Sequence, residues 1–455
     1  MKQRFYVKLI IIFALILALL IPQSFIMDLV SERTAWRQQA YDSIEQSWPG
    51  VQTLAGPMLS IPYHLTFNSK EKIIVGKVEK EVIKEVTLDD VLYIIPKQLN
   101  INSTLKSEMR YRGIYEISVY SNVLQVAGEF NNQALLDLIA EHKDKKIRWD
   151  KPQLSVLVND QRGIAAPPSL KWDNAEIAFQ PSASLPNANA GMHAALPLLA
   201  LDKATTLPFA FTMELRGMKA MSFALLSENS QVQLAANWAN PSFTGELLPE
   251  KRNITDHDFT AEWRASSFSY DVSSALEQCR KGECGYLLQR AVGFELIQPV
   301  DVYQQSERSI KYAALFIILT FMALVLFELL KKCRIYPIQY ALVGMALLVF
   351  YLLLISLSEH LLFLTAYSIG ATASMLLLTF YFGAILHSSK LGLILGAALA
   401  TLYILLYVIL QSEENALLMG SGLIFVMLAG LMLATRHFDW YALTEQDNKD
   451  AGKSA

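Results

Sequence analysis

Two kinds of hydrophobic pattern divide the chain. Residues 9–27 and 311–435 are almost continuously apolar, with charged residues only at intervals. Residues 50–310 instead alternate apolar and polar positions, which is typical of strands with one buried and one solvated face. Apolar runs of about 20 residues are long enough to cross a bilayer as helices. We therefore predict a polytopic α-helical membrane protein with six transmembrane helices (one plus five) and a large extracytoplasmic, mainly antiparallel β domain.

The first apolar run is predicted to be an uncleaved signal anchor. A basic flank in residues 1–8 precedes the run at 9–27, as in a signal peptide. A cleavable signal would also need a small-x-small site, and residues 21–25 offer none. The basic flank predicts a cytoplasmic N-terminus. Apolar residues continue at helical spacing through 28–49, so we expect an amphipathic stalk helix there.

The alternating region predicts a β sandwich or two stacked sheets. Residues 70–85 alternate Lys and Glu with Ile and Val, which indicates an exposed hairpin with charged edges. Short helices are expected at 132–142 and 273–279, and a mobile loop at 181–195. The alternation that predicts strands is clearest at 154–158, 209–215, 232–238 and 259–263.

The charges between the later spans predict the orientation. Connections at 331–334 and 387–390 are basic, whereas those at 359 and 413–414 are acidic. With a cytoplasmic N-terminus, every basic connection falls inside, in agreement with the positive-inside rule. We therefore expect a periplasmic domain at 50–310, a bundle at 311–435 and a cytoplasmic tail at 436–455. The five later spans are expected at 312–330, 336–357, 363–386, 391–410 and 416–434.

Composition adds two constraints. Charged residues are 18% of the 455 and the formal net charge is −3, so nothing suggests a nucleic-acid partner. Cys279 and Cys284 bracket a short polar turn in the external domain, and they are a candidate local disulfide. A metal pair is less expected because no second pair with matching spacing lies nearby.

Four polar residues in the membrane region are candidates for a functional role. Glu328 is either an interfacial carboxylate paired with Lys331-Lys332 or a buried acid that lines an ion or substrate path. Glu359 and His360 either end a helix or relay protons at the outer interface. Gln339 is expected to hydrogen-bond across helices.

Catalytic signatures are missing from the sequence. The seven histidines show no metal-ligand spacing, and there is no nucleophile elbow, P-loop or dinucleotide-binding motif. We therefore expect no catalytic residue, no metal and no cofactor. No acidic residue lies near the centre of a predicted span, which argues against a secondary transporter.

Short stretches spread over nearly the whole chain form a recognisable set in a fixed order. They are Gly56-Pro57, Ile61-Pro62, Asp160–Ile164, Asn237–Gly245, Leu248-Pro249, Leu319–Met322, Phe327-Glu328, Pro337–Tyr340, Leu342–Gly344, Phe350–Leu354, Leu357–His360, Thr435-Arg436 and Asp439–Leu443. Together they resemble the CreD inner-membrane protein family, often called cell-envelope integrity proteins. The resemblance implies an envelope-stress product under a Cre-type two-component system, tied to responses to cell-wall-active agents. It carries over no catalytic residue.

The leading hypothesis is a non-enzymatic inner-membrane protein of envelope integrity. Its outer β domain would bind an envelope component, or a periplasmic or inner-membrane protein, while its helices contact membrane lipids. The alternative is a transporter or lipid-handling protein whose helical bundle is the working part. A membrane enzyme acting on an envelope polymer is the third hypothesis, and it has the least support.

Overall fold

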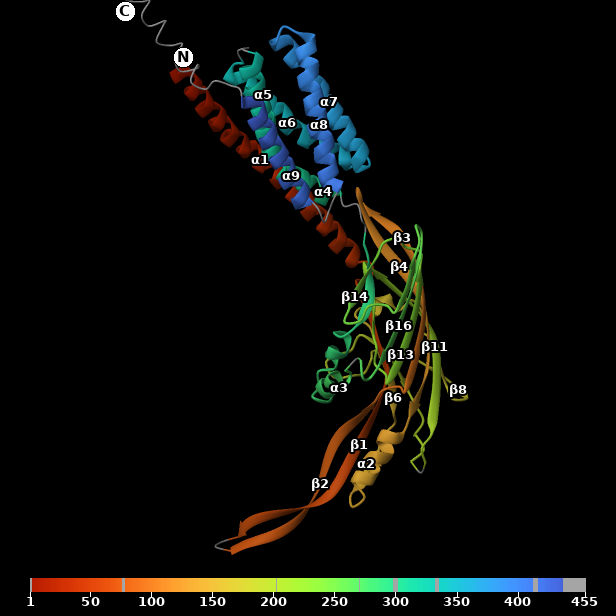
Figure 1. Ribbon diagram of the computed structural model, residues 1–455. Helices are drawn as coiled ribbons and strands as arrows, with labels where there is room; N and C mark the ends of the chain where they lie inside the picture. Colours follow the sequence, from red (N-terminus) through yellow and green to blue (C-terminus); the bar gives the residue numbers. More distant parts are fainter. Residues whose placement is uncertain are drawn as a thin grey trace, which may run out of the picture. The chain divides into compact units, whose positions relative to one another are not determined.

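A computed structural model of the chain describes residues 2–75, 78–201, 203–269, 271–297, 302–331, 335–411 and 416–436 (Figure 1). The chain divides into two compact units. The helical unit comprises Met1–Gln38 with Val300–Ala455, and the β unit comprises Gln39–Pro299. Helix α1, Lys2–Glu45, contributes residues to both units.

The helical unit is built from α1 and six later helices. Where an anchor and a stalk were predicted, the structure has the single helix α1, with Pro22 inside it. The later helices are α4 (Val302–Lys311), α5 (Ala313–Lys331), α6 (Pro337–Ser358), α7 (Phe363–Ile385), α8 (Ser389–Gln411) and α9 (Ala416–Thr435).

Several of these helices could span a membrane. Among the described residues, α1, α6, α7 and α8 are long and apolar enough, and the bent pair α4–α5 would add a fifth span. The described apolar part of α9 is shorter, Leu418–Gly430. These findings show a polytopic membrane protein, and they leave the six-span count as a prediction. The charged connections at 332–334 and 413–414 lie outside the described residues.

Helix α4 was not predicted. Residues 302–310 were assigned to the β domain, whereas the structure forms a helix there that belongs to the helical unit. Its buried positions recur at helical spacing and include Tyr303, Ser306 and Ile310. Because serines occupy part of the buried face, the hydrophobic pattern does not reveal the helix.

The β unit contains two sheets. Sheet A has nine strands in the order β14-β17-β12-β1-β6-β10-β9, with β2 and β5 also paired to β1, and sheet B has eight in the order β15-β16-β13-β3-β4-β11-β7-β8. The strands are β1 (Gln52–Val75), β2 (Val78–Ile94), β3 (Gln98–Arg112), β4 (Tyr115–Asn131), β5 (Lys146–Trp149), β6 (Gln153–Leu157), β7 (Ser169–Trp172), β8 (Ala175–Ala178), β9 (Gln180–Pro181), β10 (Gly191–Ala195), β11 (Thr206–Met218), β12 (Ala220–Ala224), β13 (Asn229–Ala236), β14 (Pro241–Gly245), β15 (Lys251–Ile254), β16 (Phe259–Ser266) and β17 (Val292–Leu296).

The two sheets share one core. Leu54 and Met58 of sheet A and Ile101 and Trp263 of sheet B belong to the same buried cluster. The period-2 pattern produces this core, because alternate residues of β3, β13 and β16 are buried. The prediction of a mainly β domain is confirmed. Most pairs are antiparallel, but β1 with β12 and β13 with β3 are parallel, which alternation alone does not reveal.

The local predictions have mixed outcomes. The predicted hairpin is confirmed as the long β1–β2 hairpin, which extends past α2 in Figure 1. The predicted helices are α2 (Gln133–Glu141) and α3 (Ser273–Arg280). The prediction of a mobile loop at 181–195 is wrong over its last part, because β10 pairs with β6 inside sheet A. The glycine and alanines of β10 are too small to give a hydrophobic alternation.

Candidate functional site

Glu328, near the C-terminal end of α5, is paired with Lys8 of α1. The Lys8 ammonium donates to both carboxylate oxygens, at 2.6 Å to Oε2, and to the carbonyl oxygen of Ile335. The Tyr340 hydroxyl donates to the same Oε2 at 3.1 Å. Both charged side chains are less than one-fifth exposed. The cluster therefore neutralises the carboxylate and ties α1 to α5 and to the start of α6.

This partner differs from the predicted one. The sequence suggested that Glu328 pairs with Lys331-Lys332, and Lys332 lies outside the described residues. The partner that the structure shows, Lys8, is 320 positions away along the chain. Spacing along one helix cannot reveal such a pair, although the basic flank of the first helix had already been singled out.

Glu359, directly after α6, is paired with Arg33 of α1. Arg33 Nε lies 3.4 Å from Glu359 Oε1, an ion-pair contact in which this buried oxygen accepts no hydrogen bond from the described residues, and the Glu359 side chain is only 11% exposed. The Arg33 guanidinium also lies 4.8 Å from the centre of the Trp36 ring. His360 is exposed. The structure thus joins Glu359 to a cation on α1, and a relay with His360 is not what its contacts indicate.

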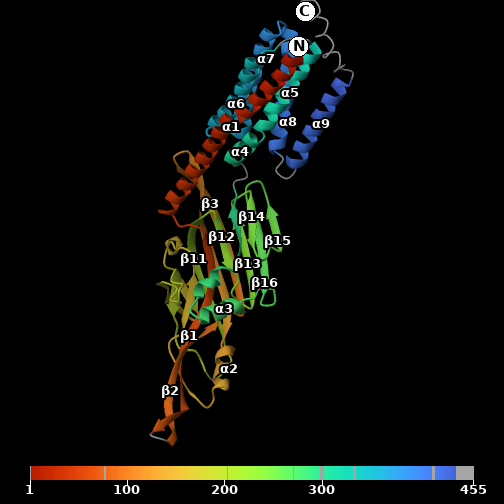
Figure 2. The same cartoon turned by 90° about the vertical axis from the view of Figure 1, so that its left-hand side faces the viewer.

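The two pairs lie at opposite ends of the same stretch of α1, which runs beside α6 (Figure 2). Lys8 and Arg33 are 25 positions apart in one helix, or about 37 Å at 1.5 Å per residue, and they lie within roughly 20° of the same face. That length exceeds the roughly 30 Å of bilayer hydrocarbon. Their partners Ile335 and Glu359, which flank α6 at its two ends, are a similar number of residues apart. We call this arrangement the two-ended clamp.

Between the two pairs, the same face of α1 is apolar and buried. The buried side chains recur at intervals of four and seven residues, as one face of a helix requires. They pack into the core of the helical unit. These residues are Ile12, Leu19, Ile26 and Val30.

Gln23 is a polar residue in this face that sequence reasoning missed. Its Nε2 donates to the carbonyl oxygen of Ile310 at 3.0 Å. Ile310 lies where α4 and α5 meet at a bend of 42°, so its carbonyl oxygen is near the helix break. An unsatisfied carbonyl in hydrocarbon costs several kcal/mol. The sequence feature that could have indicated this contact is the polar pair Gln23-Ser24 inside an otherwise apolar run.

Gln339 has a local role instead of the predicted one across helices. The Tyr336 N–H donates to Gln339 Oε1 at 2.8 Å. Gln339 is the third residue of α6, after Pro337 at its start. The first N–H groups of a helix have no partner within the helix, and a glutamine at this position supplies one.

In the β unit, Arg162 caps the end of α1. Its guanidinium donates to the carbonyl oxygens of Glu45 and Gln46, both at 3.0 Å, and pairs with Asp160 at 2.6 Å. The last carbonyls of a helix need such partners. The Arg162 hydrogen bond is also the main reason why the pKa of Asp160 is lowered. Asp160 and Arg162 therefore fix the end of α1, and both belong to one of the stretches that resemble the family described above.

His64 lies between two carboxylates on the β1–β2 hairpin. Its Nδ1 is 2.5 Å from Asp89 Oδ1 and its Nε2 is 3.0 Å from Asp150 Oδ2. These hydrogen bonds raise the pKa of His64 above 6.5. In the described part of the chain, no group of three or more His, Cys, Asp or Glu side chains could hold a metal ion.

Cys279 and Cys284 are joined by a disulfide, and both are fully buried. The bond closes the turn between α3 and the short 3-10 helix Cys284–Leu288. Both cysteines belong to the core of the β unit.

These features define a class: a polytopic membrane protein that carries a large β domain. A family model described as "Inner membrane protein CreD" matches residues 4–441. The inner membrane protein CreD of Escherichia coli (strain K12) is 32% identical over 445 residues, which cover 98% of this chain and 95% of the relative. The chain therefore belongs to the CreD inner-membrane protein family, as the resemblance implied, and it is a multi-pass inner-membrane protein.

One solved structure also matches part of the chain. An M1 zinc metallopeptidase from Deinococcus radiodurans shares 7% identity, covers 38% of each chain and has a TM-score of 0.19. That score is too low to indicate a common fold.

Proposed function

We propose that this protein is a non-enzymatic component of cell-envelope integrity. In this proposal the helical unit is an anchor, and the β unit binds an envelope component or a partner protein. The observation that carries the proposal is the two-ended clamp. Glu328 and Glu359, the acids that a transport path would use, are each paired with a cation of α1.

The position of these pairs supports an anchor. Ionisable residues that move ions or protons face a water-filled cavity or lie near the bilayer midplane. Glu328 and Glu359 instead contact residues of α1 that are about 37 Å apart along the helix. The pairs therefore lie where the two interfaces would be, and they hold helices together.

The proposed orientation places both termini in the cytoplasm and the β unit in the periplasm. In the six-span order, the end of α5 and the start of α6 face the cytoplasm together with Lys8. The end of α6 then faces the periplasm together with Arg33. Both ion pairs agree with this order, since each joins groups assigned to the same side.

Charge exchange tests the anchor role. The double variants K8E/E328K and R33E/E359R keep one cation and one anion at each site but exchange their positions. If the pairs only hold helices together, both variants restore survival of a strain without the protein when it is exposed to a cell-wall-active agent. If an acid at position 328 or 359 is part of a path, the matching exchange abolishes the rescue although the protein still accumulates in the membrane.

One observation favours the transporter or lipid-handling alternative. In the described structure, the buried side-chain oxygens of Gln23 Oε1, Ser306 Oγ, Ser309 Oγ and Tyr351 OH have no hydrogen-bond partner. Such groups are costly in hydrocarbon unless water or a solute contacts them. The variant S306A/S309A distinguishes the two functions, because a membrane anchor should keep its function when these hydroxyl groups are lost, whereas a polar transport path should not.

A further inference from the structure

The outward face of sheet B carries amide side chains on its central strands. In β3, Gln98, Asn100 and Asn102 are exposed, and the residues between them are buried. Strand β13 pairs with β3 in parallel, and its own amides lie directly beside them. On the other side, Gln125 of β4 lies opposite Asn102. We call this set the amide strip: Gln98, Asn100, Asn102, Gln125, Asn229, Gln231 and Gln233.

Strand formation does not explain this choice of residues. Asn is among the residues that are depleted in strands, and a solvated face could carry Thr at lower cost. The side chains are also not used internally. Gln231 Nε2 donates to Glu262 at 2.9 Å, and none of the other six amides hydrogen-bonds to another described residue. Each free amide offers two donors and one acceptor.

The strip is continuous and hollowed. Three shallow depressions of about 490, 510 and 340 Å³ lie along it, and Asn100 and Asn102 line two of them each. The lining residues run from β16 to β7 across β13, β3, β4 and β11. At about 4.8 Å between neighbouring strands, these six strands span roughly 24 Å. That length suits a chain-like ligand.

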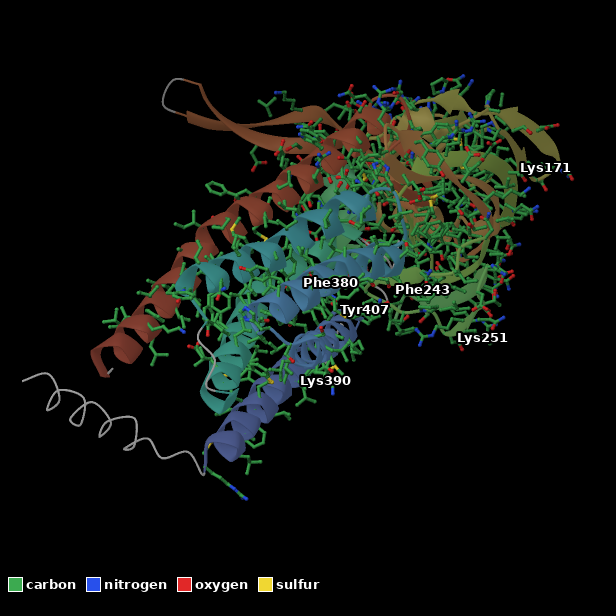
Figure 3. The ribbon with its side chains drawn as sticks, turned by 90° about the horizontal axis from the view of Figure 1, so that it is seen from above. Lys171, Phe243, Lys251, Phe380, Lys390 and Tyr407 are labelled. Atoms are coloured by element: carbon green, nitrogen blue, oxygen red, sulfur yellow. A yellow bond between two sulfur atoms is a disulfide. The ribbon has the colours of Figure 1, made fainter. Side chains whose placement is uncertain are left out.

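Charge at one border of the strip is partly neutralised. Glu262 lies 3.4 Å from Lys251 and 2.6 Å from Arg264, so one carboxylate offsets part of their charge. Arg252 lines the same depression as Lys251 and forms no ion pair with another described residue. Lys171 belongs to β7, near the opposite edge of sheet B, and it lines the depression at that border (Figure 3). The amides between these borders carry no charge. The strip itself therefore offers many uncharged donors and acceptors, and the positive side chains stand only at its two borders.

These properties exclude several ligand classes. An anionic polymer is bound by clusters of unpaired Lys and Arg, whereas Arg252 and Lys171 stand singly at opposite borders of the strip. A protein partner needs buried aromatic or aliphatic anchors, whereas the residues of the strip are amides. An extended peptide adds to a free strand edge, but β3, β13 and β4 are paired on both sides. Sugar hydroxyl and acetamido groups both donate and accept hydrogen bonds, as the amides do.

We infer that the amide strip binds an uncharged glycan chain. The inference rests on the proposed function, because it names the ligand class of the β unit. The chain would lie across the strands, with its hydroxyl or acetamido groups bonded to successive amides. Asn102 and Gln233 are adjacent in the register, are both exposed and line the same depression, so they are the contacts to test.

The test is a titration of the full-length protein in detergent by isothermal calorimetry. The probes are chitohexaose, which carries acetamido groups, and maltohexaose, which carries only hydroxyls. We expect saturable binding of at least one of them, and the other shows whether the acetamido group is required. The variant N102A/Q233A should weaken binding about tenfold or more, because two amides lose their hydrogen bonds. The control Q180A removes an exposed strand amide of sheet A and should leave the affinity unchanged.

Two results would overturn the inference. One is the absence of binding by both oligosaccharides. The other is equal binding by the wild type and N102A/Q233A, with unchanged melting temperatures that show both are folded. Binding of polyglutamate or an unstructured peptide in place of the sugars, lost in N102A/Q233A, would reject the glycan and keep a binding role for the β unit. The proposed function itself is tested separately by the charge-exchange variants.

Discussion

In the helical unit, the acids Glu328 and Glu359 pair with cations of another helix. The β unit instead exposes uncharged amides, most of which form no side-chain hydrogen bond with another described residue. The difference follows from the surroundings of each unit. In hydrocarbon an unpaired polar group costs several kcal/mol, so polar side chains there are paired, placed at the ends, or functional. In water an exposed amide costs little and remains available to a ligand. This difference supports our proposal that the helical unit anchors the protein and the β unit binds a ligand or partner.

The largest effect is expected from Glu328→Ala. The change leaves Lys8 less than one-fifth exposed and without its carboxylate, which should cost about 3 kcal/mol of unfolding free energy. Equilibrium unfolding in mixed micelles measures it. The exposed Lys390 provides the control K390A, which should have little effect. A loss equally small in both variants would show that the clamp does not stabilise the helical unit.

A smaller loss of unfolding free energy is expected from Arg162→Ala. Two carbonyls at the end of α1 lose a charged donor, and the Asp160 carboxylate loses its partner. R162K should recover little, because an ammonium cannot form the same fork of contacts. Thermal unfolding followed by tryptophan fluorescence measures both variants. The exposed Arg252 provides the control R252A, and an equal shift in that control would contradict the capping role.

Gln23→Leu should cost somewhat less, about 1 kcal/mol. The carbonyl of Ile310 loses a donor inside the helical unit, and hydrogen bonds between membrane helices are worth about 0.6 kcal/mol on average. The same unfolding assay measures the change, with F25L at a lipid-exposed position as the control. A gain in stability would mean that the unpaired Oε1 of Gln23 costs more than its Nε2 bond contributes.

The smallest expected effect is a change in pH dependence at His64. The folded-state pKa of His64 is raised above 6.5 by its hydrogen bonds to Asp89 and Asp150, with smaller opposing effects of desolvation and of Arg148. The stabilisation is therefore fully present below about pH 6.5 and is lost as the pH rises through the folded-state pKa. Hydrogen exchange at the imidazole C2 position, read by mass spectrometry, gives that pKa. A pKa at or below 6.5 would contradict the pairing of His64 with the two carboxylates. The variant H64Q should lose the pH-dependent stabilisation that His64 contributes.

The sequence predicted the pattern-driven parts of the fold. Period-2 alternation located β11, β13 and β16, and long apolar runs located α6, α7 and α8. It did not reveal β10, in which Gly191 and two alanines are too small to give a hydrophobic alternation, or α4, whose buried face contains Ser306 and Ser309. The hydrophobic pattern of a segment predicts its secondary structure through its buried face. It therefore predicts nothing where the buried residues of that face are not apolar.

The candidate site was only partly predictable for a related reason. Glu328 and Glu359 stood out as rare charges in an apolar region, but their partners lie hundreds of residues away on α1. The amide strip was invisible along the chain, because its members come from three strands and meet only through the register of β13, β3 and β4. A row of alternating polar residues in one strand looks like any solvated face.

Binding by the β unit and anchoring by the helical unit are the two roles that we propose for this protein. Both are tested by the survival of cells that carry N102A/Q233A in place of the wild type, exposed to a cell-wall-active agent at equal membrane levels of protein. We expect survival as low as in cells without the protein, and wild-type survival for the matched Q180A control. Full survival with N102A/Q233A would mean that the amide strip is not needed and that the β unit does not act through it.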